Sequence, residues 1–168
     1  MNEPIRYPAA IWKPLTGHSS PGTLAQRNTV VLHITAGSTM EGAFNTFQGS
    51  IAPHRVSAHF IIDRAGKVYQ LMSVSETAWH ASQANGHSVG IEHVAIPVKL
   101  LPTEEQYAAS AALVRWLCDQ MKVPVDRIHV RGHNEASPAD GHVGCCAPTL
   151  DPDRVVAMAA ALSPEIPT

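Results

Sequence analysis

Apolar positions follow two patterns along the chain. The first, a short and nearly continuous apolar run, predicts strands. Nearly continuous apolar runs occupy residues 29–35 and 87–96, as is typical of strands buried inside a sheet. The runs 58–62 and 67–72 are separated by the turn-forming residues Asp-Arg-Ala-Gly, which predicts a hairpin. We expect one more short strand within 126–133.

The second pattern, an apolar residue every three or four positions, predicts helices. It is clearest over 103–121, where Thr103 and Gln106 match the capping box that opens many helices. Two shorter helices are expected over 39–50 and 151–162. Because strands and helices are interspersed, the sequence predicts an α/β fold with a central mixed β-sheet flanked by helices.

The chain of 168 residues has the length of one domain with its own core. Residues 1–28 are rich in Pro, Gly, Ser and Thr, and we interpret them as an irregular arm that packs on the domain. The apolar side chains expected to anchor this arm are Ile11, Trp12 and Leu15. The domain itself is expected over 29–162, followed by a tail or the start of a linker over 163–168.

Composition narrows the possible partners. The formal net charge is -2, which provides no basic field for nucleic acid. No apolar run approaches the roughly 18 residues of a membrane span, and the first residues do not match a Sec-type signal peptide. We therefore expect synthesis in the cytoplasm, and we expect a monomer. Three cysteines, two of them adjacent, imply no disulfide framework.

Histidine is unusually frequent, with ten in the chain, and such enrichment is typical of proteins with a metal site or pH-dependent chemistry. A hydrolytic zinc site needs three protein ligands, usually His with Cys or a carboxylate, and a carboxylate that moves protons. His33 lies in an apolar strand, His133 follows a short strand, and Cys145 and Cys146 follow in a loop. Glu92 lies in another apolar strand, where an unpaired carboxylate is costly. Each residue also has a purely structural explanation, so the residues alone leave both interpretations open.

The order of the segments favours the metal site. The segments LHITAG, VSAHF, AWHA, VGIE and RGH, followed by a loop with cysteine, come in that order along the chain. In this order the chain resembles the zinc-dependent N-acetylmuramoyl-L-alanine amidases of the amidase-2 family, which share their fold with the peptidoglycan recognition proteins. The resemblance covers about residues 28–158.

The resemblance implies a role for particular residues. It implies one Zn²⁺ per chain, held by His33, His133 and a third ligand that is either Cys145, which aligns without a gap, or Cys146. It implies that Glu92 is the catalytic base and later the acid.

Other family positions lie near the oxyanion and the substrate cleft, and some of them have a different residue in this chain. His142 is the one cationic candidate near the place where many relatives have a lysine that stabilises the oxyanion. Trp79 and His80 match a Trp-His pair that lines the substrate cleft, and Ala58 stands where some relatives have a tyrosine near the metal.

These assignments imply an enzyme that hydrolyses the amide bond between N-acetylmuramic acid and L-alanine in peptidoglycan. A binding module of the same fold that holds muropeptides without cleaving them is the alternative. A third possibility is a thiol hydrolase that pairs a cysteine with His133 or His142. We expect one of two biological roles. The first, which the arm and tail favour, is that of a bacteriolytic phage endolysin acting on the cell wall, and the second is that of a cytoplasmic enzyme of muropeptide recycling.

Overall fold

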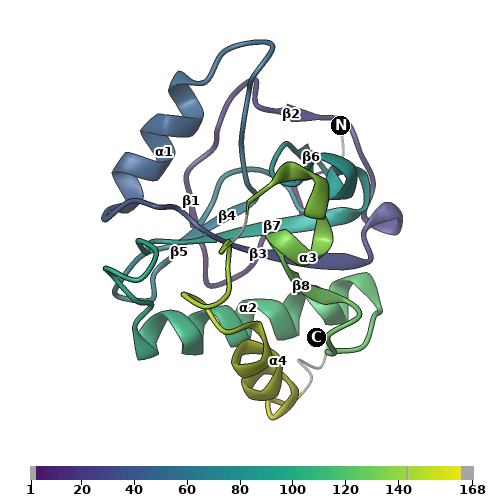
Figure 1. Cartoon of the computed structure of the whole chain (residues 1–168). Coiled ribbons are helices and arrows are strands. Elements are labelled where there is room, and N and C mark those ends of the chain that lie inside the picture. The colour runs from purple at the N-terminus through teal and green to yellow at the C-terminus, as the bar shows by residue number, and fades with distance from the viewer. Residues whose placement is uncertain (1–2, 143, 164–168) are drawn as a thin grey trace.

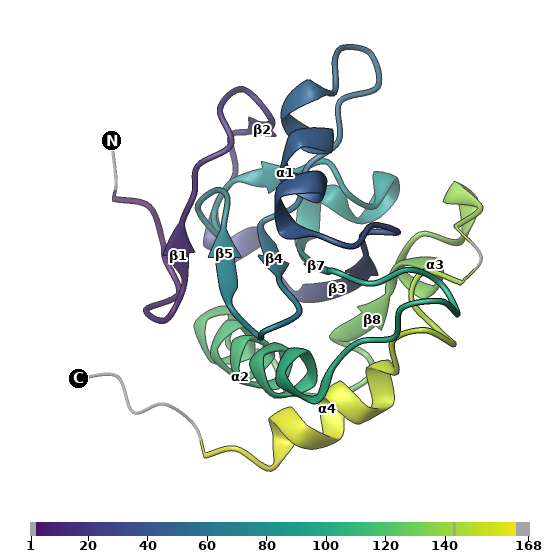
Figure 2. The same cartoon turned by 90° about the vertical axis from the view of Figure 1, so that its left-hand side faces the viewer.

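The computed structural model describes residues 3–142 and 144–163, and it consists of a mixed β-sheet with helices on both faces (Figures 1 and 2). The strands are β1 (Ile11–Trp12), β2 (Ser19–Ser20), β3 (Thr29–Ile34), β4 (Phe60–Ile62), β5 (Val68–Gln70), β6 (Thr77–Ala78), β7 (Ser88–His93) and β8 (Val130–Gly132). The helices are α1 (Met40–Gly49), α2 (Glu104–Met121), α3 (His133–Ala136) and α4 (Pro152–Ala160), with 3₁₀ turns η1 (Leu24–Gln26), η2 (Ser82–His87) and η3 (Pro138–Asp140).

The six-stranded sheet has the order β1-β5-β4-β7-β3-β8. Only β4 and β5 pair antiparallel within it, as the predicted hairpin, while the other neighbours are parallel. The predicted mixed sheet is therefore confirmed. Parallel strands that meet in the centre bring their carboxyl ends to one edge of the sheet, which is where α/β proteins usually bind ligands.

Successive side chains of β3 point to opposite faces of the sheet. Val30 and Leu32 join the main apolar cluster, which also contains the buried side of α2 and α4. Val31 points to the other face and packs against Ala81 and Ala84. Since His33 is two residues beyond Val31, it lies on this second face, together with α1, which packs on the neighbouring part of the sheet (Figure 2).

Local sequence signals place the helix starts as predicted. The Thr103 hydroxyl accepts from the Gln106 backbone N–H, and the Gln106 side chain returns a bond to the Thr103 backbone, completing the capping box of α2. The strand expected within 126–133 is shorter than predicted. Asp126 instead accepts the backbone N–H groups of Ile128 and His129, so that part of the segment forms a turn.

The expected irregular arm is partly regular. Leu15 is buried as predicted, but Ile11 is 48% exposed, because β1 joins the sheet edge by backbone pairing with β5 rather than by burying this side chain. Arg27 is buried and donates to five backbone carbonyls and to Thr77 Oγ1. The arm thereby fixes the loops on both sides of β6. The predicted tail lies outside the described residues beyond position 163.

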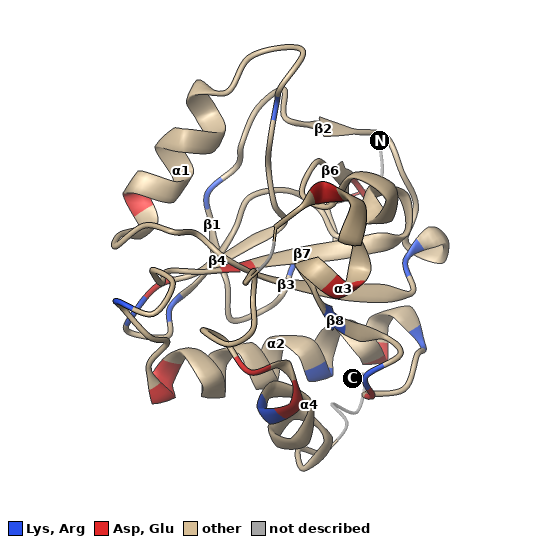
Figure 3. Cartoon of the chain, viewed as in Figure 1, with Lys and Arg blue, Asp and Glu red and all other residues tan. Residues whose placement is uncertain are grey.

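Within the described residues, no helix combines the length and the apolar character that crossing a membrane requires. In the view of Figure 3, Lys and Arg positions are spread over several elements and interleaved with Asp and Glu.

Candidate metal centre and active site

The candidate site lies where β3, β7 and β8 end. His33 pairs with Glu92 across β3 and β7, so the two side chains leave the sheet side by side on the same face. Leu32 pairs with Gly132 across β3 and β8, which brings His133, the first residue of α3, next to His33. The two imidazole ring centroids are 4.5 Å apart. Sheet register therefore assembles residues that are 100 positions apart in the sequence.

A thiol completes this cluster. One ligand atom each of His33, His133 and Cys145 lies within 4.8 Å of the others. The Cys145 Sγ is 3.9 Å from His33 Nδ1. Two tetrahedral zinc ligands, one sulfur and one nitrogen, are about 3.6 Å apart, so the observed spacing suits such an ion with little adjustment.

The second nitrogen of each imidazole already has a partner. His133 Nε2 is 3.0 Å from a carboxylate oxygen of Asp140, and His33 Nε2 is 2.9 Å from His80 Nδ1. In both rings this leaves Nδ1 for a metal. A histidine whose other nitrogen is held by a carboxylate or another acceptor is the usual arrangement around protein-bound zinc.

The electrostatic state of these groups suits metal binding. Burial lowers the pKa of His33 well below its ordinary value, and burial also lowers the pKa of His133, so both rings are neutral at pH 7. Burial raises the pKa of the Cys145 thiol to about 12. The thiol therefore needs a cation to become a thiolate at neutral pH.

Glu92 is the unusual carboxylate of the site. Burial raises its pKa from 4.5 to about 8, and its buried Oε2 has no hydrogen-bond partner among the described residues. A buried polar atom without a partner is costly to stability and is characteristic of groups kept for chemistry.

The structure distinguishes the two adjacent cysteines. Cys145 lines the pocket with the imidazoles, whereas Cys146 is fully buried and its Sγ donates to the Leu32 carbonyl. Gly132 makes room for this thiol, because a Cβ at that position would lie 2.9 Å from Cys146 Sγ. Of the two thiols, Cys145 is the one that lies beside the imidazoles of His33 and His133.

A cavity of about 350 Å³ opens over the cluster. Its walls are mostly apolar, with Phe47, Val56 and Pro97 among them. Trp79 and His80, which the resemblance assigns to the substrate cleft, also line this cavity. His142 also lines the cavity; its ring stacks on that of His133 at 4.5 Å. Ala58 is not brought to the cavity: it is fully buried in the apolar cluster beneath α1, and the preceding Ser57 reaches the wall instead.

Two further histidines near the site have structural partners. His93 points to the opposite face from Glu92, as expected, and bonds the His33 carbonyl and the Ser110 hydroxyl. His59 bonds the Glu76 carbonyl and accepts the Gly90 N–H. No pattern in the sequence points to Asp140, since a lone aspartate in a polar loop has no distinguishing signal.

Comparisons with known proteins agree with this geometry. A profile of the family described as N-acetylmuramoyl-L-alanine amidase matches residues 24–153. The chain is 32% identical over 90 residues to N-acetylmuramoyl-L-alanine amidase A of Achromobacter lyticus, covering 53% of this chain and 49% of that protein. It is 35% identical over 89 residues to 1,6-anhydro-N-acetylmuramyl-L-alanine amidase AmpD of Escherichia coli K12, covering 48% of each.

The matched region thus spans about half the length of these curated relatives. Among solved structures, a selenomethionine derivative of AmpD superposes with a TM-score of 0.75 at 24% identity, covering 91% of this chain and 96% of that one. The shared fold therefore extends over nearly the whole chain.

Proposed function

The chain belongs to the N-acetylmuramoyl-L-alanine amidase family, and from this premise we propose that it hydrolyses the amide bond between N-acetylmuramic acid and L-alanine with one bound Zn²⁺. The observation that carries the proposal is the position of Glu92. Its carboxylate, whose buried Oε2 has no partner in the described part of the chain, leaves the sheet directly beside His33. It lines the same cavity as the cluster of two imidazoles and one thiol.

The donor set supports zinc as the metal. His33 and His133 would bind through Nδ1 and Cys145 through its thiolate, and three protein ligands of this kind are typical of catalytic zinc sites. A bound zinc ion would supply polarisation of the amide carbonyl and would lower the pKa of water to about 7.

Glu92 is suited to move the proton. Its pKa of about 8 without metal lies near neutrality, where a group can both accept and donate a proton. A cation nearby favours the ionised form, so Glu92 is a base when the site is loaded. Its carboxylate accepts a proton from the attacking water and then donates that proton to the departing amide nitrogen of L-alanine.

Two cavity residues are assigned to the substrate. His142 is exposed and lines the cavity in the place where relatives have lysine. A ring N–H of this side chain would donate to the oxygen on which negative charge develops. Trp79, whose indole N–H donates to Ser20 Oγ, offers a fixed apolar face to the substrate.

The pKa of Cys145 argues against the thiol hydrolase. A nucleophilic cysteine needs a lowered pKa, whereas burial raises that of Cys145 to about 12. A metal ligand has no such requirement, because the metal itself displaces the proton.

The test begins with verified metal-free protein and purified peptidoglycan. We expect no release of L-alanine amino termini without metal, and full release after one equivalent of zinc is added. Cleavage by the metal-free protein would exclude the mechanism. Binding of muropeptides by zinc-loaded protein without cleavage would identify the non-catalytic module instead.

Mass spectrometry of the products addresses the preferred substrate. We propose polymeric peptidoglycan, as for an endolysin, and we take soluble 1,6-anhydro muropeptides as the second candidate because the name of the Escherichia coli relative specifies them. Faster cleavage of whole sacculi than of fragments supports the first, and the reverse order supports the second.

A further inference from the structure

We propose that His80 is a positioning residue: together with Ser88 it fixes His33 as the tautomer that carries hydrogen on Nε2 and presents Nδ1 to the metal. The inference rests on the proposed metal site but not on catalysis. It gives His80 a role different from the substrate contact that the sequence implied.

A directed chain of hydrogen bonds carries the argument. Ser88 Oγ is 2.6 Å from the Ala84 carbonyl oxygen, which can only accept, so the hydroxyl hydrogen is committed to that bond. His80 Nε2 is 3.2 Å from the same hydroxyl oxygen, which is left to accept from it. His80 therefore has its hydrogen on Nε2.

The position of this hydrogen on His80 determines which nitrogen of His33 carries hydrogen. A neutral imidazole carries one N–H, so His80 Nδ1 is an acceptor. It lies 2.9 Å from His33 Nε2, which must then be the donor. His33 Nδ1 has no hydrogen in this tautomer, and its lone pair faces Cys145 Sγ across 3.9 Å. The other tautomer would place a hydrogen where the metal has to bind.

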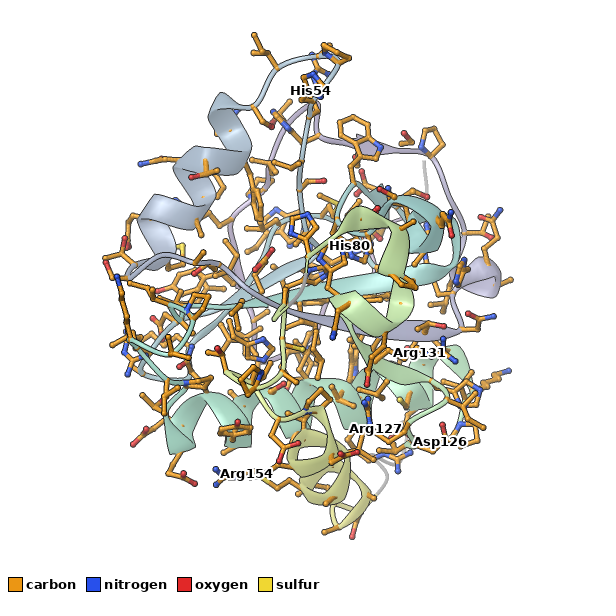
Figure 4. All side chains as sticks on the ribbon, in the orientation of Figure 1. His54, His80, Asp126, Arg127, Arg131 and Arg154 are labelled. Carbon is orange, nitrogen blue, oxygen red and sulfur yellow. The ribbon has the colours of Figure 1, made fainter. Side chains whose placement is uncertain are left out.

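The fold holds the His80 ring firmly in this place. The backbone N–H groups of His80 and Ala81 both donate to Asn85 Oδ1. The ring rests directly on Gly90 of β7, where an added Cβ would approach it to 2.7 Å. Figure 4 shows His80 near the middle of the molecule, whereas His54 lies at the tip of a distant loop.

Different hydrogen-bond partners thus orient the two histidines of the proposed metal site. His133 has the carboxylate of Asp140, whose charge attracts the ring N–H directly. The partner of His33 Nε2 is His80 rather than a carboxylate, so the His33 tautomer depends on the direction that the Ala84 carbonyl imposes through Ser88 and His80. Loss of an outer partner of this kind typically weakens metal binding by about 10- to 100-fold.

Zinc affinity, measured by competition with a chromogenic chelator and without substrate, tests the proposal. We expect His80→Ala to weaken binding by about 10- to 100-fold, and Ser88→Ala to weaken it by a smaller factor. His80→Asn should restore most of the affinity, because its amide oxygen can accept from His33 Nε2. His87→Ala, at an exposed histidine in the same segment, is the matched control and should not change the affinity.

Long-range ¹⁵N–¹H correlation spectra of the metal-free wild-type protein give a second readout that needs no variant. We expect both His33 and His80 to carry hydrogen on Nε2. Hydrogen on Nδ1 of His33, or unchanged zinc affinity in folded His80→Ala, would overturn the proposal. Because neither readout involves cleavage, a protein with these properties that fails to hydrolyse peptidoglycan would disprove only the proposed function.

Discussion

Replacing the buried carboxylate Glu92 by an amide, Glu92→Gln, should make the metal-free protein more stable while lowering the proposed amidase activity. In the folded protein the pKa of Glu92 is raised from 4.5 to about 8, since burial disfavours its charged form. In the unfolded chain the same group ionises at its ordinary pKa. Folding is therefore opposed wherever the unfolded chain has already lost this proton.

The magnitude follows from the two pKa values. One unit of pKa corresponds to about 1.4 kcal/mol, so at alkaline pH the ionised Glu92 lowers the free energy of unfolding by up to about 5 kcal/mol. The effect is absent below pH 4.5, grows as pH rises towards 8 and is constant above that. At pH 7 it amounts to about 3 kcal/mol.

Urea denaturation in the presence of a chelator measures this effect at pH 5 and pH 9. The stability of Glu92→Gln relative to wild type should increase by about 4 kcal/mol between these two pH values. Any cost of burying the amide is independent of pH and cancels in that comparison. The exposed carboxylate Glu3 supplies the matched control, and Glu3→Gln should follow the wild-type pH dependence.

The same variant should retain zinc and lower the proposed amidase turnover by about 10²- to 10⁴-fold, because the group to which we assign proton transfer is gone. A wild-type protein and a Glu92→Gln variant with the same dependence of stability on pH would refute the reasoning about burial. Full activity in the variant would refute its role as the base.

Three further predictions address the surroundings of the site. Cys145→Ser should lose tight zinc binding, whereas Cys146→Ser should keep it and lower the denaturation midpoint; equal zinc loss in both would contradict the assignment of the ligand. Asp140→Ala should weaken zinc binding by about 10- to 100-fold in a chelator competition, and an unchanged affinity would show that His133 needs no outer partner. Gly132→Ala should lower the free energy of unfolding in urea by about 1–3 kcal/mol, because its Cβ would press on a buried thiol. Gly49→Ala is the control and should be neutral or stabilising, because an added Cβ meets nothing within 4 Å at this helical position. Similar losses in both variants would contradict the packing argument.

Local patterns determined much of the fold. Because side chains alternate along β7, the sequence predicts that Glu92 and His93 face opposite sides of the sheet. In the structure Glu92 lines the cavity, and His93 bonds Ser110 of α2. The capping box at Thr103 fixed the start of that helix. Such features depend on residues within a few positions of one another, so the sequence alone carries the information.

The tertiary structure alone decided which groups meet. Both cysteines fit the family pattern, and only their packing distinguishes them. Cys146 packs against Gly132, whereas Cys145 lies within 4.8 Å of the ligand atoms of both imidazoles. The outer partners of the two imidazoles, Asp140 and His80, could not be found either, because hydrogen bonds between distant segments leave no periodicity in the chain. Spacing along a chain records which way a side chain points, whereas what it touches depends on sheet register and on loops whose paths are set by long-range packing.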